Sequence, residues 1–170
     1  RERLGERCYA EGADTSLSRV LGQALRARGA TLAVAESCTG GLLGALLSEP
    51  AGASAYFLGG VITYSNDAKV KELGVRAQTL TAFGAVSPET VIEMAQGARE
   101  RWGTTYAAAL TGVAGPQGGT PDKPVGTMHV AVAGPRGVRH KHYTMSFGRE
   151  RTRLLAAYWA LAMTLREVNS

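Results

Sequence analysis

The segment TLAVAESCTGG (residues 31–41) places a Ser hydroxyl where an apolar, strand-like stretch gives way to two glycines. A Ser at the end of a strand can present its hydroxyl in the crevice at the edge of an α/β sheet, where ligands bind in such folds. Free amide N–H groups at the start of the next helix could hold an oxyanion or a phosphate group. The segment therefore predicts a nucleophile at Ser37 or, alternatively, a helix cap formed by Ser37 or Thr39.

Cys38 is a rival nucleophile in the same segment, and it would need a base such as His129, His140 or His142. All three histidines fall in or near a predicted strand hairpin, where we expect them to be surface or hairpin residues. They lack the spacing and the third ligand typical of a zinc site, so the sequence predicts no metal.

The segment TYSNDAK (residues 63–69) forms a second candidate site, because a predicted strand ends at Tyr64 and leads through a polar turn to Lys69. A Tyr or Lys side chain near a Ser could accept its proton if burial or neighbouring cations lowered the pKa of that side chain. An Asx turn with a solvent-facing Lys explains the same spacing equally well.

Two further segments could contact an anionic ligand. Residues 110–126 (LTGVAGPQGGTPDKPVG) are rich in Gly and Pro directly after a predicted strand, which suits a loop that cradles a phosphate or a ring. The loop matches neither a Walker A nor a G-x-G-x-x-G motif, and a plain surface loop is the alternative. Arg149 and Arg153 share one face of the last predicted helix, so they could bind a phosphate or form a surface stripe.

Predicted helices and strands alternate along most of the chain. Apolar spacing and composition predict helices near residues 17–25, 42–47, 66–73, 88–102 and 154–168. Strands are predicted at residues 31–35, 56–64, 106–110, 127–132 and 138–145. This order predicts a three-layer α/β/α sandwich with a mixed, mostly parallel sheet. The last two strands, joined by the four residues Gly134 to Gly137, should form an antiparallel hairpin.

Composition narrows the classes of function. The chain has 170 residues, of which 45% are hydrophobic and 19% charged, as in an ordinary globular domain. A net charge of +5 favours acidic partners, but aromatic residues make up only 6%, so we do not expect nucleic acid binding. Two cysteines without a CxxC pair indicate a reducing, cytoplasmic compartment. No apolar run approaches the ~20 residues of a membrane span, and we expect no membrane partner.

Four stretches, in one order, resemble the C-terminal domain of the CinA family of competence/damage-inducible proteins. They are AESCTGG (35–41), YSNDAK (64–69), GAVS with MAQG (84–87 and 94–97) and TGVAGPQGG…KPVG (111–126). The resemblance makes residues 16–170 the expected domain and residues 1–15 a linker or arm. Residues 1–12 also resemble the connection that precedes this domain in full-length CinA, so we expect a preceding domain as a partner.

The resemblance implies an activity, because stand-alone members of the family are nicotinamide mononucleotide (NMN) deamidases. They hydrolyse the carboxamide of NMN to nicotinic acid mononucleotide and ammonia, with no metal and no cofactor. The family pattern makes Ser37 the nucleophile, assisted by Tyr64 and Lys69, with the proton passing to Lys69 directly or through Tyr64. Amides around residues 38–41 would hold the oxyanion. The residues expected to contact the substrate are Glu36, Cys38, Thr39, Gly40, Gly41, Thr111, Gly112, Ala114, Gly115, Arg149 and Arg153.

One departure from the family pattern falls at the start of the last helix. The family has Gly-Asp-Arg there, whereas this chain has Phe147 and Gly148 before Arg149, so an Asp that could orient Arg149 is lost. Because family members often form oligomers, we expect a homo-oligomer. Two other functions fit the sequence: a non-catalytic interaction module in competence or the DNA-damage response, and a Ser/Lys amidase acting on another small amide.

Overall fold

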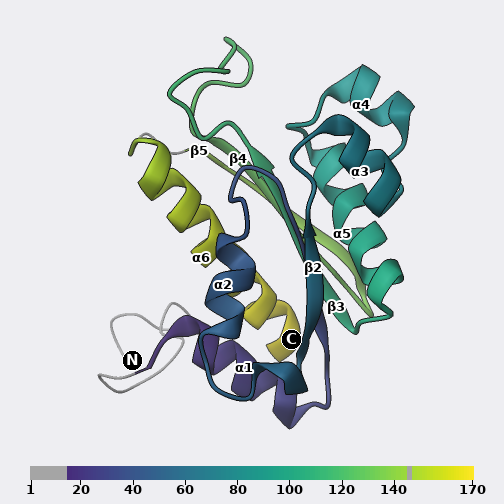
Figure 1. The fold of residues 1–170 in the computed structure, drawn as a ribbon, viewed down its shortest axis with the longest axis vertical. Coiled ribbons are helices and arrows are strands. Elements are labelled where there is room, and N and C mark those ends of the chain that lie inside the picture. Colours follow the sequence, from purple (N-terminus) through teal and green to yellow (C-terminus); the bar gives the residue numbers. More distant parts are fainter. Residues whose placement is uncertain (1–14, 145–146) are drawn as a thin grey trace.

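A five-stranded sheet organises the chain (Figure 1), and the computed structural model describes residues 15–144 and 147–170. In chain order the strands are β1 (Leu32–Glu36), β2 (Phe57–Ile62), β3 (Tyr106–Gly112), β4 (Thr127–Gly134) and β5 (Gly137–Thr144). They lie side by side in the order β2-β1-β3-β4-β5. β1 pairs in parallel with β2 and β3, whereas β4 pairs antiparallel with β3 and β5. The predicted mixed sheet and its C-terminal hairpin are therefore confirmed. Two strand pairings are parallel and two are antiparallel, because β4 alone runs opposite to the other strands.

Helices cover both faces of the sheet, which completes the predicted α/β/α sandwich (Figure 1). One face carries α1 (Leu17–Ala27), α2 (Leu42–Ser48) and α6 (Arg149–Asn169), and the other α3 (Asn66–Leu73), α4 (Ala77–Phe83) and α5 (Pro88–Trp102). Helix α4 was not predicted, because its seven residues make only about two turns, too short a segment to show a helical period. Within the described ranges, no helix combines the length and the hydropathy that crossing a membrane requires.

Two sequence predictions fall wholly or partly on residues that the structure does not describe. The predicted arm at 1–15 lies outside the described residues, except for Thr15. The predicted end of the last strand at Met145 also lies outside them, and β5 is described to Thr144.

The two faces of the sheet carry side chains of different size. On β1, Leu32 and Val34 belong to the core shared with α1 and α6, while Ala33 and Ala35 belong to the core shared with α5. β4 repeats this alternation of larger residues and alanine, whereas β3 has Ala108 as well as Leu110 on the first face. Because both faces are covered, β1 is buried at every position, as its continuous apolar sequence predicts. The alanine face lets α5 pack closely against the centre of the sheet.

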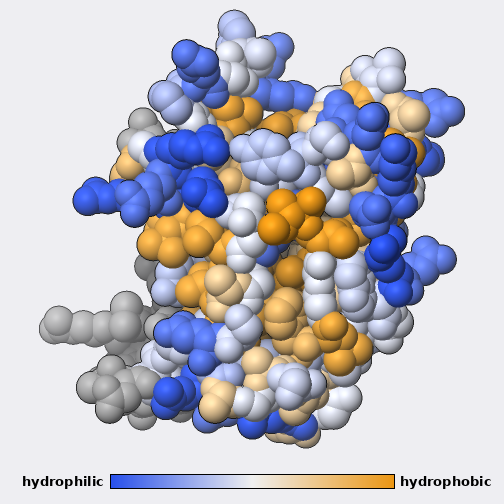
Figure 2. Space-filling model, viewed as in Figure 1, coloured by the Kyte–Doolittle hydropathy of each residue, from blue (hydrophilic) through white to orange (hydrophobic). Residues whose placement is uncertain are grey.

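The two edges of the sheet differ in polarity. At the β2 edge, Leu58 and Ile62 are 48% and 55% exposed, and Figure 2 shows hydrophobic residues over β2. β5 forms the other edge, with the sequence GVRHKHYT and mostly exposed polar side chains. Charged side chains on an edge strand oppose pairing with another chain, so only the β2 edge lacks this protection.

Candidate active site

β1, β2 and β3 run parallel, and their carboxyl ends lie together at one end of the sheet, beside a cavity of about 270 Å³. Ser37 directly follows β1, Tyr64 lies shortly beyond β2, and the loop at 113–118 continues from β3. Ligands commonly bind at the carboxyl ends of the strands in open α/β sheets. The described residues that line the cavity are Ser37, Cys38, Tyr64, Lys69, Ala85, Val86, Thr111, Gly112, Val113, Ala114, Gly115, Gln117, Gly118 and Arg149.

Lys69 contacts the Ser37 hydroxyl directly. The Lys69 Nζ lies 3.1 Å from Ser37 Oγ and donates a second hydrogen bond of 2.7 Å to the carbonyl oxygen of Thr63. Lys69 is 1% exposed, and burial lowers its pKa from 10.5 to about 8. A fraction of the lysine is therefore uncharged near neutral pH, and an uncharged amine can accept the Ser37 proton.

The start of α3 places Lys69 at this position. Ser65 caps the helix by accepting a hydrogen bond of 3.1 Å from the Ala68 amide. Lys69 then lies one turn into the helix, on the side that faces the end of β1. The prediction of a polar turn after the strand is confirmed, whereas the alternative of a solvent-facing Lys is excluded by its burial.

The turn after β1 is held by Glu36 rather than by Ser37 or Thr39. The Glu36 carboxylate accepts hydrogen bonds from the amides of Gly41, Leu43 and Gly44 at 3.0, 3.1 and 2.8 Å. It thereby satisfies the first amides of α2, whose N-cap position makes no side-chain cap bond of its own. The helix-cap alternative for Ser37 and Thr39 is therefore wrong, and the Ser37 hydroxyl is left free to contact Lys69.

Several residues expected to contact the substrate lie outside the cavity lining. Glu36 is 1% exposed and its carboxylate is occupied by α2, so it has no surface toward a ligand. Gly40 and Gly41 have φ angles of +61° and +101°, so glycine is needed there for the turn itself. Thr39 is fully buried. These residues shape the turn, and the structure does not bring them to the cavity.

The two arginines of α6 occupy different positions. Arg149 lines the cavity, where its Nη1 donates to the Gly115 carbonyl at 2.8 Å and its Nη2 to the Tyr64 hydroxyl at 3.3 Å. Arg153 lies outside the lining and donates to the carbonyls of the turn at 38–39. Of the two, only Arg149 lines the cavity, whereas Arg153, also expected to contact the substrate, lies on the backbone of the turn.

Tyr64 lies at the rim of the cavity, where it is 61% exposed. Its hydroxyl accepts a hydrogen bond from Arg149, and no hydrogen bond joins it to Ser37 or Lys69 among the described residues. Lys69 is therefore the group in direct contact with the Ser37 hydroxyl. The described lining includes Lys69 and Arg149 but neither Asp nor Glu, so the cavity favours an anionic ligand.

Cys38 is poorly suited to be the nucleophile. Its Sγ packs 3.5 Å from the Sδ of Met128 in a buried cluster, and burial raises the pKa of the thiol to about 11. The histidines that could serve it as a base contact one another instead. The ring of His129 stacks on those of His140 and His142, and burial lowers its pKa to about 4. In the described part of the chain, no group of three His, Cys, Asp or Glu side chains is placed to hold a metal ion.

A family model described as the CinA C-terminal domain matches residues 14–168. The chain belongs to the CinA C-terminal domain family. A CinA-like protein of Geotalea daltonii is 46% identical over 165 residues, and one of Synechocystis sp. is 48% identical over 161 residues. These alignments cover 97% and 92% of this chain but 40% and 38% of the relatives, so the chain spans about two fifths of their length.

Solved structures of CinA proteins have the same fold. The competence/damage-inducible protein of Agrobacterium tumefaciens is 40% identical with a TM-score of 0.84, covering 94% of this chain and 100% of that one. A CinA superfamily protein of Klebsiella pneumoniae is 36% identical with a TM-score of 0.87, covering 90% and 96%. The predicted CinA resemblance and fold class are confirmed by these comparisons.

The sequence did not point to Ala85 and Val86, which also line the cavity. Val113, Gln117 and Gly118 fall in the loop at 110–126 that was predicted to cradle a phosphate or a ring. The hydroxyl of Thr111 donates to the Ala85 carbonyl at 2.9 Å and so ties the segment before α5 to the end of β3. The GAVS motif of the CinA family at 84–87 was the available signal, because it marks this segment without assigning a role to it.

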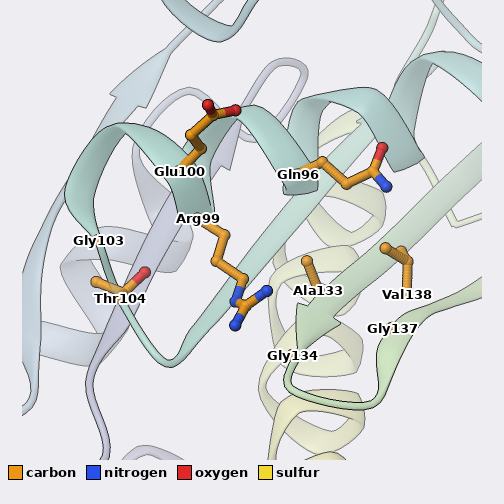
Figure 3. Close-up of a pocket in the computed structure, with 9 residues that line it drawn as sticks. All are labelled: Gln96, Arg99, Glu100, Gly103, Thr104, Ala133, Gly134, Gly137 and Val138. Atoms are coloured by element: carbon orange, nitrogen blue, oxygen red, sulfur yellow. The ribbon is translucent and has the colours of Figure 1, made fainter.

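A second cavity of about 500 Å³ lies away from the parallel strand ends, between the C-terminal turn of α5 and the β4–β5 hairpin (Figure 3). It is larger than the Ser37 cavity, and Arg99 points toward it (Figure 3). Its described lining contains no Cys, Ser or Lys. The contact between a buried amine and a hydroxyl that marks the Ser37 cavity therefore has no counterpart among the described residues that line the second cavity.

Proposed function

We propose that this CinA domain hydrolyses the carboxamide of NMN to nicotinic acid mononucleotide and ammonia, with Ser37 as nucleophile and Lys69 as general base. The single observation that carries the proposal is the contact of 3.1 Å between Lys69 Nζ and Ser37 Oγ. Burial and a lowered pKa allow this lysine to act as a base. The family resemblance supplies the substrate, and the cationic cavity is consistent with its phosphate.

The reaction begins when the Ser37 Oγ attacks the carboxamide carbon and its proton passes to the uncharged Lys69 amine. The carbonyl oxygen of the substrate becomes an oxyanion, which backbone amides of the turn after β1 stabilise. Lys69 then returns the proton to the amide nitrogen, which leaves as ammonia and gives an acyl-enzyme. Water attacks this ester with Lys69 again accepting a proton, and Ser37 is regenerated as the carboxylate product leaves.

Arg149 supports binding of the substrate phosphate. The guanidinium is held at the cavity by the carbonyl of Gly115 and by the hydroxyl of Tyr64, and it presents positive charge beside the loop after β3. Guanidinium groups suit phosphate because several N–H donors point in one plane. The pyridine carboxamide would then lie toward Ser37, with the ribose phosphate at the rim.

The two alternative functions make different demands on the surface. A basic face for nucleic acid would need the cations between residues 136 and 153 to be free and contiguous. Arg136 and Arg139 instead each lie 3.5 Å from a carboxylate oxygen of Glu167, and Arg149 lines the cavity. A Ser/Lys amidase for another small amide would use the same Ser37 and Lys69, so only a substrate panel separates it from the main proposal.

The proposal is tested by measuring ammonia release from NMN, nicotinamide riboside, nicotinamide and simple aliphatic amides. Wild type should act on NMN best, whereas Ser37→Ala and Lys69→Met should each lose at least about 10³-fold in kcat. Lys71→Met is the matched control for Lys69→Met, because Lys71 is exposed on the same helix. Ser48→Ala serves the same purpose for Ser37→Ala. Inactivity of the wild type on NMN, or full activity of Ser37→Ala, would remove the proposal.

A further inference from the structure

The carbonyl groups of Ser37, Cys38 and Thr39 each have a hydrogen-bond donor. The Ser37 carbonyl accepts from the Gly40 amide at 3.1 Å. The carbonyls of Cys38 and Thr39 accept from Nε and Nη2 of Arg153 at 3.0 and 2.7 Å. One guanidinium therefore holds two successive peptide units of the turn.

Because the peptide bond is planar, a hydrogen bond that holds a carbonyl also fixes the direction of the neighbouring amide. Within a trans peptide unit the C=O and the following N–H point in opposite directions, so fixing a carbonyl also fixes the next amide. Arg153 thereby orients the amides of Thr39 and Gly40, and the Gly40 bond to Ser37 orients the amide of Cys38. Within the described ranges, no other residue accepts a hydrogen bond from the amide of Cys38, which lies in the cavity lining and can meet an oxyanion. Thr39 is fully buried outside that lining.

Glu36 removes the competing donors on the other side of the turn. Its carboxylate takes the amides of Gly41, Leu43 and Gly44, which would otherwise form a second anion site at the start of α2. Its own carbonyl accepts from the Thr63 amide at 2.7 Å, and the Thr63 carbonyl holds Lys69. Glu36 therefore links the turn of the nucleophile to the position of the base.

We propose that Arg153 and Glu36 are positioning residues that direct the amide of Cys38 toward the oxyanion. The inference rests on the proposed amide hydrolysis at Ser37. Arg153 holds the peptide between Thr39 and Gly40, whose amide bonds the Ser37 carbonyl and so fixes the amide of Cys38. This assigns Arg153 to the backbone of the turn rather than to the substrate phosphate. The position of Cys38 in the cavity lining places its amide beside the reacting group.

Arg153→Lys tests the assignment, since it keeps the charge but loses the planar fork that holds two carbonyls. We expect kcat to fall about 10²-fold on both NMN and nicotinamide riboside, with little change in KM, because the amide of Cys38 is no longer held toward the oxyanion. Glu36→Gln should also lower kcat on both substrates. Arg151→Lys is the matched control, an exposed arginine on the same helix. A loss confined to NMN and expressed in KM would show that Arg153 binds phosphate and would overturn the inference.

A second measurement does not depend on activity. Hydrogen exchange of the amide of Gly40 should accelerate at least about tenfold in Arg153→Lys relative to Arg151→Lys, because the bond to the Ser37 carbonyl would be released. Unchanged exchange would overturn the inference even if the domain acts on NMN. Conversely, faster exchange in a domain that is inert toward NMN would support the positioning role while removing the proposed function. Equal thermal midpoints of the two variants would exclude general unfolding as the cause.

Discussion

The amine of Lys69 and the hydroxyl of Ser37 lie 3.1 Å apart although 32 residues separate them in the chain. Ser37 directly follows β1 and the helix after β2 carries Lys69, so the parallel pairing of β1 and β2 creates the contact. No carboxylate forms a salt bridge with Lys69 in the described part of the chain, and its burial therefore favours the uncharged amine.

Activity should depend on the protonation of Lys69. Because the uncharged amine is the base, kcat/KM for NMN should rise about tenfold per pH unit below the pKa of about 8 and level off above it. Initial rates between pH 6 and 10 would measure this profile. A flat profile across pH 8, with the substrate unchanged, would argue against Lys69 as the base.

The same pKa shift should appear in the stability of the protein. Between the folded pKa of about 8 and the unfolded value of 10.5, the unfolded chain binds more protons at Lys69 than the folded chain does. The free energy of unfolding of wild type, minus that of Lys69→Met, should therefore rise with pH across this window. The rise should approach about 3 kcal/mol, since one pKa unit corresponds to about 1.36 kcal/mol. Urea titrations at pH 7, 9 and 10.5 would measure it, and parallel curves for the two proteins would contradict the shift.

Cys38 should be dispensable for the reaction. Cys38→Ala leaves the backbone amide in place and removes only a thiol that packs against Met128, so kcat should stay within about threefold of wild type. Iodoacetamide should also label Cys38 far more slowly in the folded protein than in urea, because burial raises the pKa of the thiol to about 11. Peptide mass spectrometry locates the label. If Cys38→Ala were inactive and Ser37→Ala active, the nucleophile would be Cys38 and not Ser37.

Arg149 should contribute to binding more than to the chemical step. Removing the guanidinium in Arg149→Met should raise KM for NMN by about 10-fold or more, since a hydrogen bond to a charged group contributes about 1.5–3 kcal/mol. Nicotinamide riboside, which has no phosphate, should be affected much less. Steady-state kinetics on both substrates, with Arg151→Met as the exposed control, would measure the difference. An equal effect on the two substrates would place the phosphate elsewhere.

Gly97 should be indispensable for packing between α5 and α3. A Cβ at this position would lie 1.8 Å from the carbonyl oxygen of Leu73, so Gly97→Ala should destabilise the fold by at least about 2 kcal/mol. Gly44→Ala is the control, because its Cβ would meet nothing closer than 3.5 Å and alanine favours the helix by roughly 0.5–1 kcal/mol. Thermal or urea unfolding would compare them, and a stable Gly97→Ala would contradict the close approach.

Several elements could be predicted because their signals are local. The strand predicted at 31–35 and the helices predicted to begin at residues 66 and 88 each depend on neighbouring residues only. Helix α4 has no such signal, and its Thr79 hydroxyl instead bonds Glu93 of α5 at 2.7 Å. That helix is defined by packing against another element, which a local pattern does not encode.

The sequence by itself determined the order of strands and helices, the family, and the presence of a Ser at the end of a strand. It left open whether Ser37 caps a helix, whether Lys69 faces solvent, and whether Arg153 binds a phosphate or belongs to a surface stripe. The tertiary structure decided these points, because each depends on which groups the pairing of β1 and β2 and the packing of α6 bring within hydrogen-bond distance. The period and composition of a segment specify its own conformation, whereas burial and contacts between distant residues arise only when the sheet assembles.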